Sequence, residues 1–301
     1  PCRQNFYLLY KPTNMRSSTT WSLTLFLTLL LWSCGSEPTT QETEDDTTTT
    51  EEAAAEAGVV GEEVTYKTDM TTMIGYLSYD SSKEEKRPGV LVVHEWWGHN
   101  DYARKRADML AELGYVALAV DMYGEGKQAD HPDDAGKFAM SVMSNFPTAE
   151  ARFRAAVETL KADPRVDPNS IAAIGYCFGG GVVLSMANTG MEDLDAVASF
   201  HGSLALPVMP EEGKVNTRVL VCNGAADPFV TPENIADYTA AMDKAQADYK
   251  LINYEGAKHS FTSKEADANG EKFGLPLAYN EEADKKSWEE MKAMFADVFG
   301  Q

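Results

Sequence analysis

The sequence has little cysteine and no cluster of metal-ligating residues. Only four cysteines occur in 301 residues: Cys2, Cys34, Cys177 and Cys222. No CxxC pair is present, and no group of cysteines and histidines has the spacing of a zinc site. We therefore expect neither a disulfide framework nor a structural metal.

Basic residues are also scarce. Lys and Arg total 26 against 47 Asp and Glu, which gives a formal net charge of -21. Such an acidic surface repels nucleic acid and has no electrostatic attraction to anionic lipid. This composition excludes a nucleic-acid partner. The apolar share of 44% is ordinary, so the chain can still bury a sizeable core.

The apolar segment near the N-terminus is too short to span a bilayer comfortably. Trp21–Trp32 is uncharged but only twelve residues long, which suits the core of a signal peptide. Arg16 precedes this core, and Met15 is a candidate start residue. Cys34 follows in the sequence LWSCG, which resembles a bacterial lipobox with a lipidated cysteine. An ordinary cleaved signal peptide with an unmodified Cys34 is the alternative.

These features divide the chain into three predicted parts. Residues 1–34 are the signal peptide with its lipobox, residues 35–61 are an acidic tether, and residues 62–301 are one folded domain. Residues 36–63 are rich in Thr, Glu, Asp and Ala and contain no Lys or Arg, so they have too little apolar surface to fold. We expect a bacterial cell-envelope protein, periplasmic or on the outer surface, that meets the membrane only through its lipid anchor.

Strand and helix patterns alternate along residues 62–301. Two β-rich segments open the domain and are expected to pair antiparallel, and short apolar runs then predict buried parallel strands. Strands are predicted at 62–67, 71–79, 89–93, 115–120, 170–175, 196–200, 218–223 and 249–254. Helices are predicted at 101–113, 133–145, 148–162, 178–187, 232–246 and 283–299. This alternation predicts an α/β fold, with a mostly parallel sheet and helices on both faces.

The segments that follow three predicted strands carry a candidate catalytic triad. GYCFGG matches the nucleophile-elbow pattern, with Cys177 in the nucleophile position between a strand and a helix. The helix N-terminus there favours a thiolate. Asp227 follows the next-to-last strand and His259 the last one. Alone, these two would be interpreted as a turn residue and a surface histidine, but their order after Cys177 is that of α/β-hydrolases.

The segment HEWWGH follows the strand at 89–93 and superficially resembles a zinc motif. The H-E-x-x-H motif needs its second histidine four residues after the first, and that position holds Gly98. We therefore expect this loop to supply an oxyanion-hole amide, the N–H of Trp96. The N–H of Phe178, directly after the candidate nucleophile, is the expected second donor.

Taken together, these motifs resemble the dienelactone hydrolase family over residues 63–299. The resemblance depends on VHEWWG, DMYG, GYCFGG, GAADPFV and GAKHSF in this order. It implies an α/β-hydrolase fold in which Cys177 is the nucleophile, His259 the base and then the acid, and Asp227 the residue that orients His259. It also implies that Glu95 contacts the resting thiol and helps to deprotonate it. A purely structural carboxylate is the alternative for Glu95.

The resemblance predicts the reaction chemistry of this chain better than it predicts the substrate. Family members that act on dienelactone hold its carboxylate with arginines, one of them a few residues after the histidine, where this chain has Thr, Ser and Lys at 262–264. Dienelactone itself is therefore not the expected substrate. The candidate pocket residues are Trp97, Tyr123, His201 and Phe261, although a structural role is the preferred interpretation of His201.

The expected function is hydrolysis of a small ester, lactone or thioester by a monomeric enzyme. The cysteine attacks the carbonyl, the two amides hold the oxyanion, and water hydrolyses the thioester, so neither a metal nor an organic cofactor is needed. A non-catalytic ligand-binding lipoprotein and a peptidase of the same fold are the alternatives. A binding protein has no need of all three triad residues, which argues against the first alternative.

Overall fold

The computed structural model describes residues 58–68 and 70–300. The predicted signal peptide, Cys34 and most of the predicted tether lie outside the described residues. Within residues 58–68 and 70–300, no helix is both long enough and apolar enough to cross a membrane.

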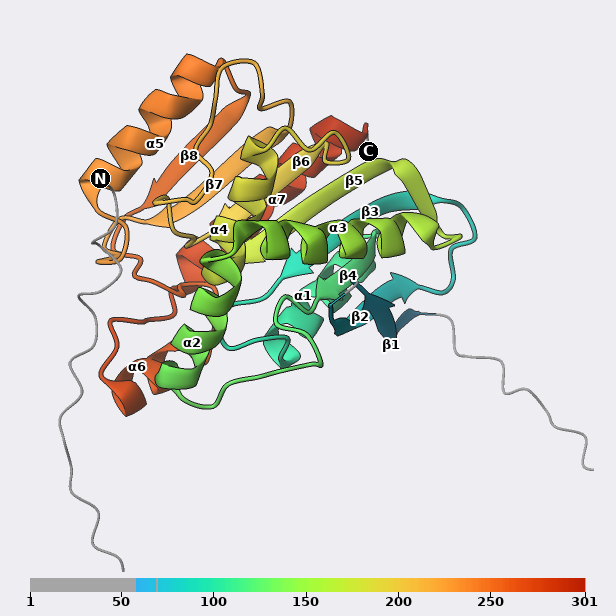
Figure 1. Cartoon of the computed structure of the whole chain (residues 1–301), viewed down its shortest axis with the longest axis horizontal. Coiled ribbons are helices and arrows are strands. Elements are labelled where there is room, and N and C mark those ends of the chain that lie inside the picture. Colours follow the sequence, from blue (N-terminus) through green and yellow to red (C-terminus); the bar gives the residue numbers. More distant parts are fainter. Residues whose placement is uncertain (1–57, 69, 301) are drawn as a thin grey trace, which may run out of the picture. The chain divides into compact units, whose positions relative to one another are not determined.

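The described chain forms one eight-stranded sheet and seven helices, most of which cover the two faces of the sheet (Figure 1). The strands are β1 Val59–Lys67, β2 Thr72–Asp80, β3 Arg87–Val93, β4 Val116–Val120, β5 Val166–Tyr176, β6 Ala196–Phe200, β7 Arg218–Gly224 and β8 Tyr249–Tyr254. The helices are α1 Asp101–Glu112, α2 Pro132–Met143, α3 Phe146–Ala162, α4 Phe178–Asn188, α5 Pro232–Ala245, α6 Ala266–Phe273 and α7 Glu281–Phe299.

The sheet has the order β1-β2-β4-β3-β5-β6-β7-β8. β1 pairs with β2 and β2 with β4 in antiparallel fashion, and every other neighbouring pair is parallel. The carboxyl ends of β3, β5, β6, β7 and β8 therefore meet at one edge of the sheet, where ligand sites of such sheets lie.

Two apolar layers hold the helices against the sheet. One face packs on α3, α4 and α5, and the other packs on α1 and α7. The central strand β3 shows why, because Leu91 and Val93 enter the first layer while Val90 and Val92 enter the second. Since side chains alternate along a strand, a strand buried on both faces must be apolar throughout. This confirms the predicted α/β class with helices on both faces.

Three local features differ from the sequence-based expectation. β1 begins at Val59, because residues 59–61 pair with the end of β2, so the predicted tether at 35–61 extends three residues too far. β5 begins at Val166 and contains a register shift opposite Pro88/Gly89, so its turn-like Asp-Pro-Asn segment belongs to the strand. The helix α6 was not predicted, because it is short and mostly polar.

Candidate active site

Cys177 occupies the sharp turn between β5 and α4. Its backbone has φ 52° and ψ -112°, a strained conformation for a residue with a side chain. Gly179 makes the turn possible, because a Cβ there would lie 2.3 Å from the carbonyl oxygen of Val93. The N–H of Gly179 instead donates to the carbonyl of His94 at 3.1 Å. The elbow is thus fastened to the loop after β3.

The structure brings the three predicted triad residues together. Nε2 of His259 lies 3.0 Å from Sγ of Cys177, and its Nδ1 lies 2.8 Å from Oδ2 of Asp227. The other carboxylate oxygen, Oδ1, accepts the N–H of Phe229 at 2.8 Å. The cysteine follows β5, the aspartate follows β7 and the histidine follows β8. The strand ends therefore bring together a thiol, an imidazole and a carboxylate, the three groups that the sequence predicts as nucleophile, base and orienting residue.

The surroundings of His259 favour its protonated form. Burial alone would disfavour an imidazolium, but the sulfur of Cys177 and the carboxylate of Asp227 outweigh burial and hold the pKa of His259 well above its usual range. The side chain of Asp227 has no exposed surface. A protonated His259 beside Cys177 is the arrangement that activates a thiol for nucleophilic attack.

The backbone N–H groups of Trp96 and Phe178 are the two predicted oxyanion donors. Each is oriented by hydrogen bonds to the carbonyl group of its own peptide plane. The carbonyl of Glu95, which shares a peptide plane with the N–H of Trp96, lies 2.5 Å from Nδ1 of His94 and accepts Gly98 N–H at 3.2 Å. Similarly, the carbonyl of Cys177 accepts Gly181 N–H at 3.3 Å, which orients the N–H of Phe178. Because a peptide plane is rigid, fixing its C=O fixes its N–H. Neither amide has an acceptor within residues 58–68 and 70–300.

His94 is a contributor to this arrangement that the sequence did not reveal. Its Nε2 accepts the N–H of Met122 at 3.2 Å, so the neutral ring carries its proton on Nδ1 and donates to the Glu95 carbonyl. Burial lowers the pKa of His94 to about 4, which keeps the ring neutral. Both ring nitrogens are occupied, which leaves neither free to bind a metal.

Glu95 has a different partner from the one that the family resemblance implies. Its Oε1 accepts the hydroxyl of Ser260 at 2.8 Å, whereas the sulfur of Cys177 is paired with His259. The expected contact with the resting thiol is thus absent from the described residues, because the imidazole holds the sulfur. Burial raises the pKa of Glu95, opposed by the Ser260 hydrogen bond and the charge of His259.

A cavity of about 560 Å³ opens beside Glu95. It lies between the loop after β3, the start of α1, and α6 with the segment before it. None of the described residues that line it is an arginine, and its charged lining comprises three further acids and one lysine. The lining residues are Glu95, Trp97, Asn100, Asp101, Tyr102, Gln128, Ala129, Asp130, Ser263, Glu265, Asn269, Lys272 and Phe273.

Of the four candidate pocket residues, Trp97 is the one that lines this cavity. Tyr123 packs on Phe178 and donates to the carbonyl of Trp96 at 2.9 Å. His201 and Phe261 are fully buried, with their rings 5.2 Å apart. Tyr123, His201 and Phe261 do not line this cavity, and the burial of His201 agrees with the structural role preferred for it.

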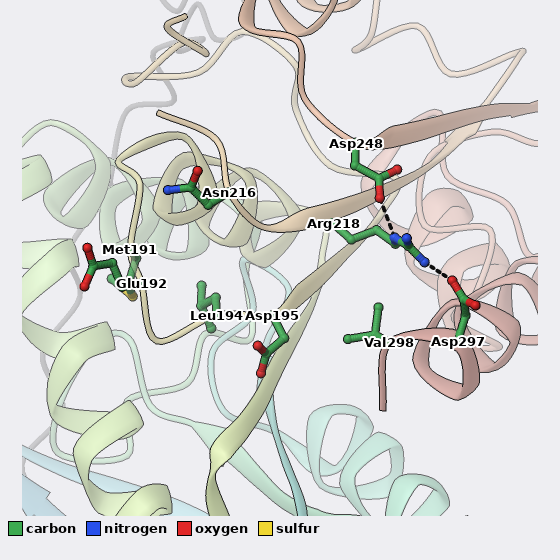
Figure 2. A pocket seen from close by; sticks show the side chains of 9 residues that line it. All are labelled: Met191, Glu192, Leu194, Asp195, Asn216, Arg218, Asp248, Asp297 and Val298. Carbon is green, nitrogen blue, oxygen red and sulfur yellow. Dashed lines mark hydrogen bonds and ion pairs between the residues drawn. The ribbon is translucent and has the colours of Figure 1, made fainter. Parts of the chain in front are cut away.

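A second cavity, of about 430 Å³, lies at the opposite edge of the sheet (Figure 2). It surrounds Arg218 at the start of β7, whose guanidinium is paired with Asp248 and Asp297. No nucleophile or histidine is among its lining residues. This cavity is remote from the catalytic edge, since β7 begins here and ends beside Asp227.

The fold and the site together define an α/β-hydrolase, by the strand order, the elbow and the chain order of the triad. The model of the dienelactone hydrolase family matches residues 73–299. The chain belongs to the dienelactone hydrolase family, and at that level it is a carboxylic ester or lactone hydrolase.

Known proteins resemble the whole folded domain. Protein usf of Aquifex pyrophilus is 29% identical over 209 residues, covering 68% of this chain and 88% of the relative. A solved structure described as m3DLH is 38% identical, with a TM-score of 0.76, covering 80% of this chain and 99% of its own. The dienelactone hydrolase-like promiscuous phosphotriesterase P91, from metagenomic libraries, is 34% identical with a TM-score of 0.74 and the same coverage.

Proposed function

We propose that this protein hydrolyses carboxylic esters or lactones through a thioester formed on Cys177. The observation that supports this most strongly is the geometry of the triad, with 3.0 Å from sulfur to imidazole and 2.8 Å from imidazole to carboxylate. Both distances are within hydrogen-bond reach, which base-assisted attack requires. The raised pKa of His259 agrees with a protonated imidazole beside the sulfur.

The proposed reaction has two halves. The sulfur of Cys177 forms a bond to the carbonyl carbon, and the oxygen of that carbonyl becomes an oxyanion held by the N–H groups of Trp96 and Phe178. Collapse breaks the ester bond, and Nε2 of His259 gives its proton to the leaving oxygen. A water then loses a proton to Nε2 and attacks the thioester, which releases the acid and restores the thiolate.

Glu95 is proposed to act on the thiol only when substrate is bound. Its carboxylate lines the cavity and is held by Ser260, one residue after the catalytic histidine. A substrate that binds in this cavity contacts Glu95. The carboxylate then accepts the proton of any Cys177 that is still a thiol.

The test is initial-rate hydrolysis of 4-nitrophenyl acetate and butyrate. Cys177→Ala and His259→Ala are each expected to lose at least about a hundredfold in kcat, because triad residues act as a unit. Cys222→Ala is the matched control, since this buried thiol lies in β7 and burial raises its pKa to about 12. Equal rates in wild type and both triad variants would reject the proposal and favour the non-catalytic binding protein.

Peptide cleavage is the alternative that a matched pair of substrates addresses. Ester and anilide substrates with the same acyl group and the same aryl leaving group differ only in the scissile bond. An esterase is expected to turn over the ester far faster, because the anilide nitrogen must be protonated before it departs. Comparable rates for the two would instead support a peptidase.

We also propose that the chain is anchored in the bacterial cell envelope through lipid on Cys34. The support is the apolar core that ends at LWSCG and the acidic segment that follows. Metabolic labelling with a fatty-acid analogue is expected to mark the wild type and not Cys34→Ser. Label that persists in Cys34→Ser would reject the anchor.

A further inference from the structure

His201 follows β6 and lies directly behind the nucleophile. Its side chain is fully buried, and its Nδ1 accepts the N–H of Cys177 at 3.1 Å. The same N–H also donates to the carbonyl of Phe200 at 3.0 Å, so it is shared between two acceptors. The backbone of His201 is itself in the left-handed region, with φ 43°. The Phe200 carbonyl and the His201 ring, from consecutive residues at the end of β6, thus both accept the N–H of the strained Cys177.

The tautomer of His201 follows from its partners. A backbone N–H can only donate, so Nδ1 must be unprotonated to accept it. The proton of the neutral ring is then on Nε2, which lies 2.7 Å from Oγ1 of Thr262 and donates to it. Thr262 belongs to the loop that carries His259. The imidazole of His201 therefore links the turn that carries Cys177 to the loop that carries His259.

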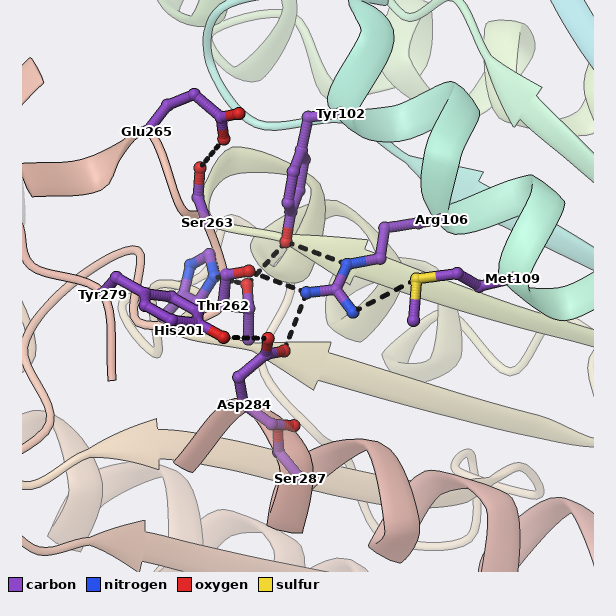
Figure 3. Close-up of polar contacts among 10 residues, drawn as sticks. All are labelled: Tyr102, Arg106, Met109, His201, Thr262, Ser263, Glu265, Tyr279, Asp284 and Ser287. Atoms are coloured by element: carbon purple, nitrogen blue, oxygen red, sulfur yellow. Dashed lines mark hydrogen bonds and ion pairs between the residues drawn. The ribbon is translucent and has the colours of Figure 1, made fainter. Parts of the chain in front are cut away.

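A buried cation holds Thr262 in place (Figure 3). Arg106, from α1, donates to the Thr262 carbonyl at 2.7 Å and to Oδ1 of Asp284, from α7, also at 2.7 Å. The hydroxyls of Tyr102 and Thr262 are 2.6 Å apart, and Nε of Arg106 donates to Tyr102 at 3.3 Å. Arg106 and Tyr102 thus hold Thr262 through its carbonyl and its hydroxyl, and that hydroxyl oxygen is the acceptor for the Nε2–H of His201.

Charge also requires a neutral ring at this position. The ring of His201 lies 5.4 Å from that of His259, which carries the positive charge of the ion pair. Burial, then the charges of His259 and Arg106, hold the pKa of His201 well below its usual range. A protonated His201 would also turn Nδ1 into a donor facing the N–H of Cys177.

We propose that His201 is a positioning residue, whose neutral Nε2–H imidazole accepts the N–H of Cys177 and keeps the nucleophile in its strained conformation. The peptide plane between Cys177 and Phe178 carries an oxyanion donor, and the backbone torsions of Cys177 aim that plane. Relaxation of Cys177 to a negative φ would turn the Phe178 N–H away. The role rests on the proposed thioester mechanism, but the hydrogen bond itself can be tested without it.

Two substitutions at His201 separate the acceptor from the bulk of the ring. Oδ1 of an asparagine falls close to the position of Nδ1, so His201→Asn should retain the acceptor and stay within about threefold of the wild-type kcat. His201→Leu keeps apolar bulk without the acceptor and should lose about tenfold in kcat with KM nearly unchanged, a scale expected for one hydrogen bond. Phe261→Leu is the control, because it disturbs packing on the same ring and leaves the bond intact.

Thr262 provides a second pair of variants that perturb the fold less. Thr262→Val is isosteric but removes the acceptor for Nε2–H, so kcat should fall several-fold, and Thr262→Ser should restore it. If His201→Leu does not fold, this pair still tests the proposal. Equal kcat for Thr262→Val and Thr262→Ser would overturn it, as would a His201→Asn variant that loses as much as His201→Leu.

The decisive readout is ¹⁵N NMR of the enzyme labelled at its five histidines. We expect the His201 signal to show an unprotonated Nδ1 and a protonated Nε2 between about pH 5 and pH 8, where an ordinary histidine titrates. A protonated Nδ1 or a titration in this range would overturn the proposal. Because this measurement needs no substrate, it holds even if the esterase assay finds no turnover.

Discussion

At the scale of single residues, the central feature is a charge balance between Cys177 and His259. The sulfur lies 3.0 Å from Nε2, and the buried Asp227 carboxylate stabilises the imidazolium from the other side. Together these partners raise the pKa of His259 despite the burial of the ring, which opposes the charge. A histidine that stays protonated at neutral pH can protonate the leaving group as soon as the carbonyl is attacked.

Asp227→Asn tests this balance through the pH profile. The asparagine removes a negative charge, so the pKa of His259 should fall toward its ordinary value. Activity requires a protonated His259, and the alkaline limb of kcat/KM should therefore move to lower pH than in wild type. The free energy of unfolding of wild type should exceed that of Asp227→Asn most at pH values below the pKa of histidine in the unfolded chain. The difference should disappear as the pH rises through the pKa of His259 in the folded protein. An unchanged alkaline limb would mean that Asp227 does not act through His259.

The sequence was sufficient to predict that Cys177, Asp227 and His259 lie close together, but not which neighbouring residues support them. Cys177, Asp227 and His259 each follow a strand, and strand ends of a parallel sheet converge, so their meeting could be predicted. The partner of Glu95 could not be, because Ser260 comes from a loop 165 residues away. The burial of Phe261 could not be predicted for a related reason, since the direction of a side chain in a loop depends on backbone torsions that no pattern encodes.

At the scale of elements, the junction of β5 and α4 must pack against the loop after β3. Gly179→Ala would place a Cβ 2.3 Å from Val93 O and 2.7 Å from His94 O, both rigid backbone atoms. We expect a loss of about 2 kcal/mol in the free energy of unfolding, typical of overpacking, and a larger loss of activity because both oxyanion amides border this contact. Denaturant unfolding and ester hydrolysis measure the two effects.

Gly181→Ala, in the same helix, is the matched control. Its Cβ would come no closer than 3.7 Å to any neighbour, the nearest being Leu206. Alanine is the better helix former by about 1 kcal/mol, so this variant should be as stable as wild type or more so. Equal effects of the two substitutions would show that helix propensity rather than the close approach governs the elbow.

Helices and strands could be predicted where apolar residues are buried in short runs. The prediction failed where polar residues form part of a strand or helix. Strand β6 begins and ends as predicted, because it is a short buried run bounded by turn residues, and β8 does so although Lys250 and Asn253 interrupt its apolar residues. β5 extends further back because Asp167 accepts hydrogen bonds from Asn169 and Ser170 within an irregular but paired segment. The helix α6 is only eight residues long and mostly polar, too short for a periodic pattern to stand out, and it is buried at Ala266 and Gly270.

At the scale of the whole molecule, the charge of -21 extends into the cavity beside Glu95. Three further acids there, Asp101, Asp130 and Glu265, face one cation, Lys272. Such a lining repels an anionic substrate. We expect neutral aryl esters to exceed carboxylate-bearing esters of the same leaving group by about tenfold in kcat/KM at low salt. The difference in kcat/KM between neutral and carboxylate-bearing esters should decrease toward about 1 M salt, where screening of the charges is strong.

Two variants of α1 make this electrostatic test specific. Asp101→Asn removes a charge at the cavity, whereas Glu112→Gln removes the same charge at the exposed far end of the same helix. Only Asp101→Asn should reduce the difference in kcat/KM between neutral and anionic esters. If both variants act alike, the net charge of the molecule rather than the cavity lining sets the preference. Faster turnover of the anionic ester by wild type would contradict the account.

The most direct test of the central claim is to identify the acyl-enzyme. The enzyme is mixed with 4-nitrophenyl acetate, quenched in acid within the first turnovers, digested and mapped by mass spectrometry. We predict one acetyl group on the peptide that contains Cys177, removed by neutral hydroxylamine as a thioester is, and absent from Cys177→Ala. An acetyl group on another residue, or undiminished turnover by Cys177→Ala, would contradict a mechanism in which this cysteine is the nucleophile.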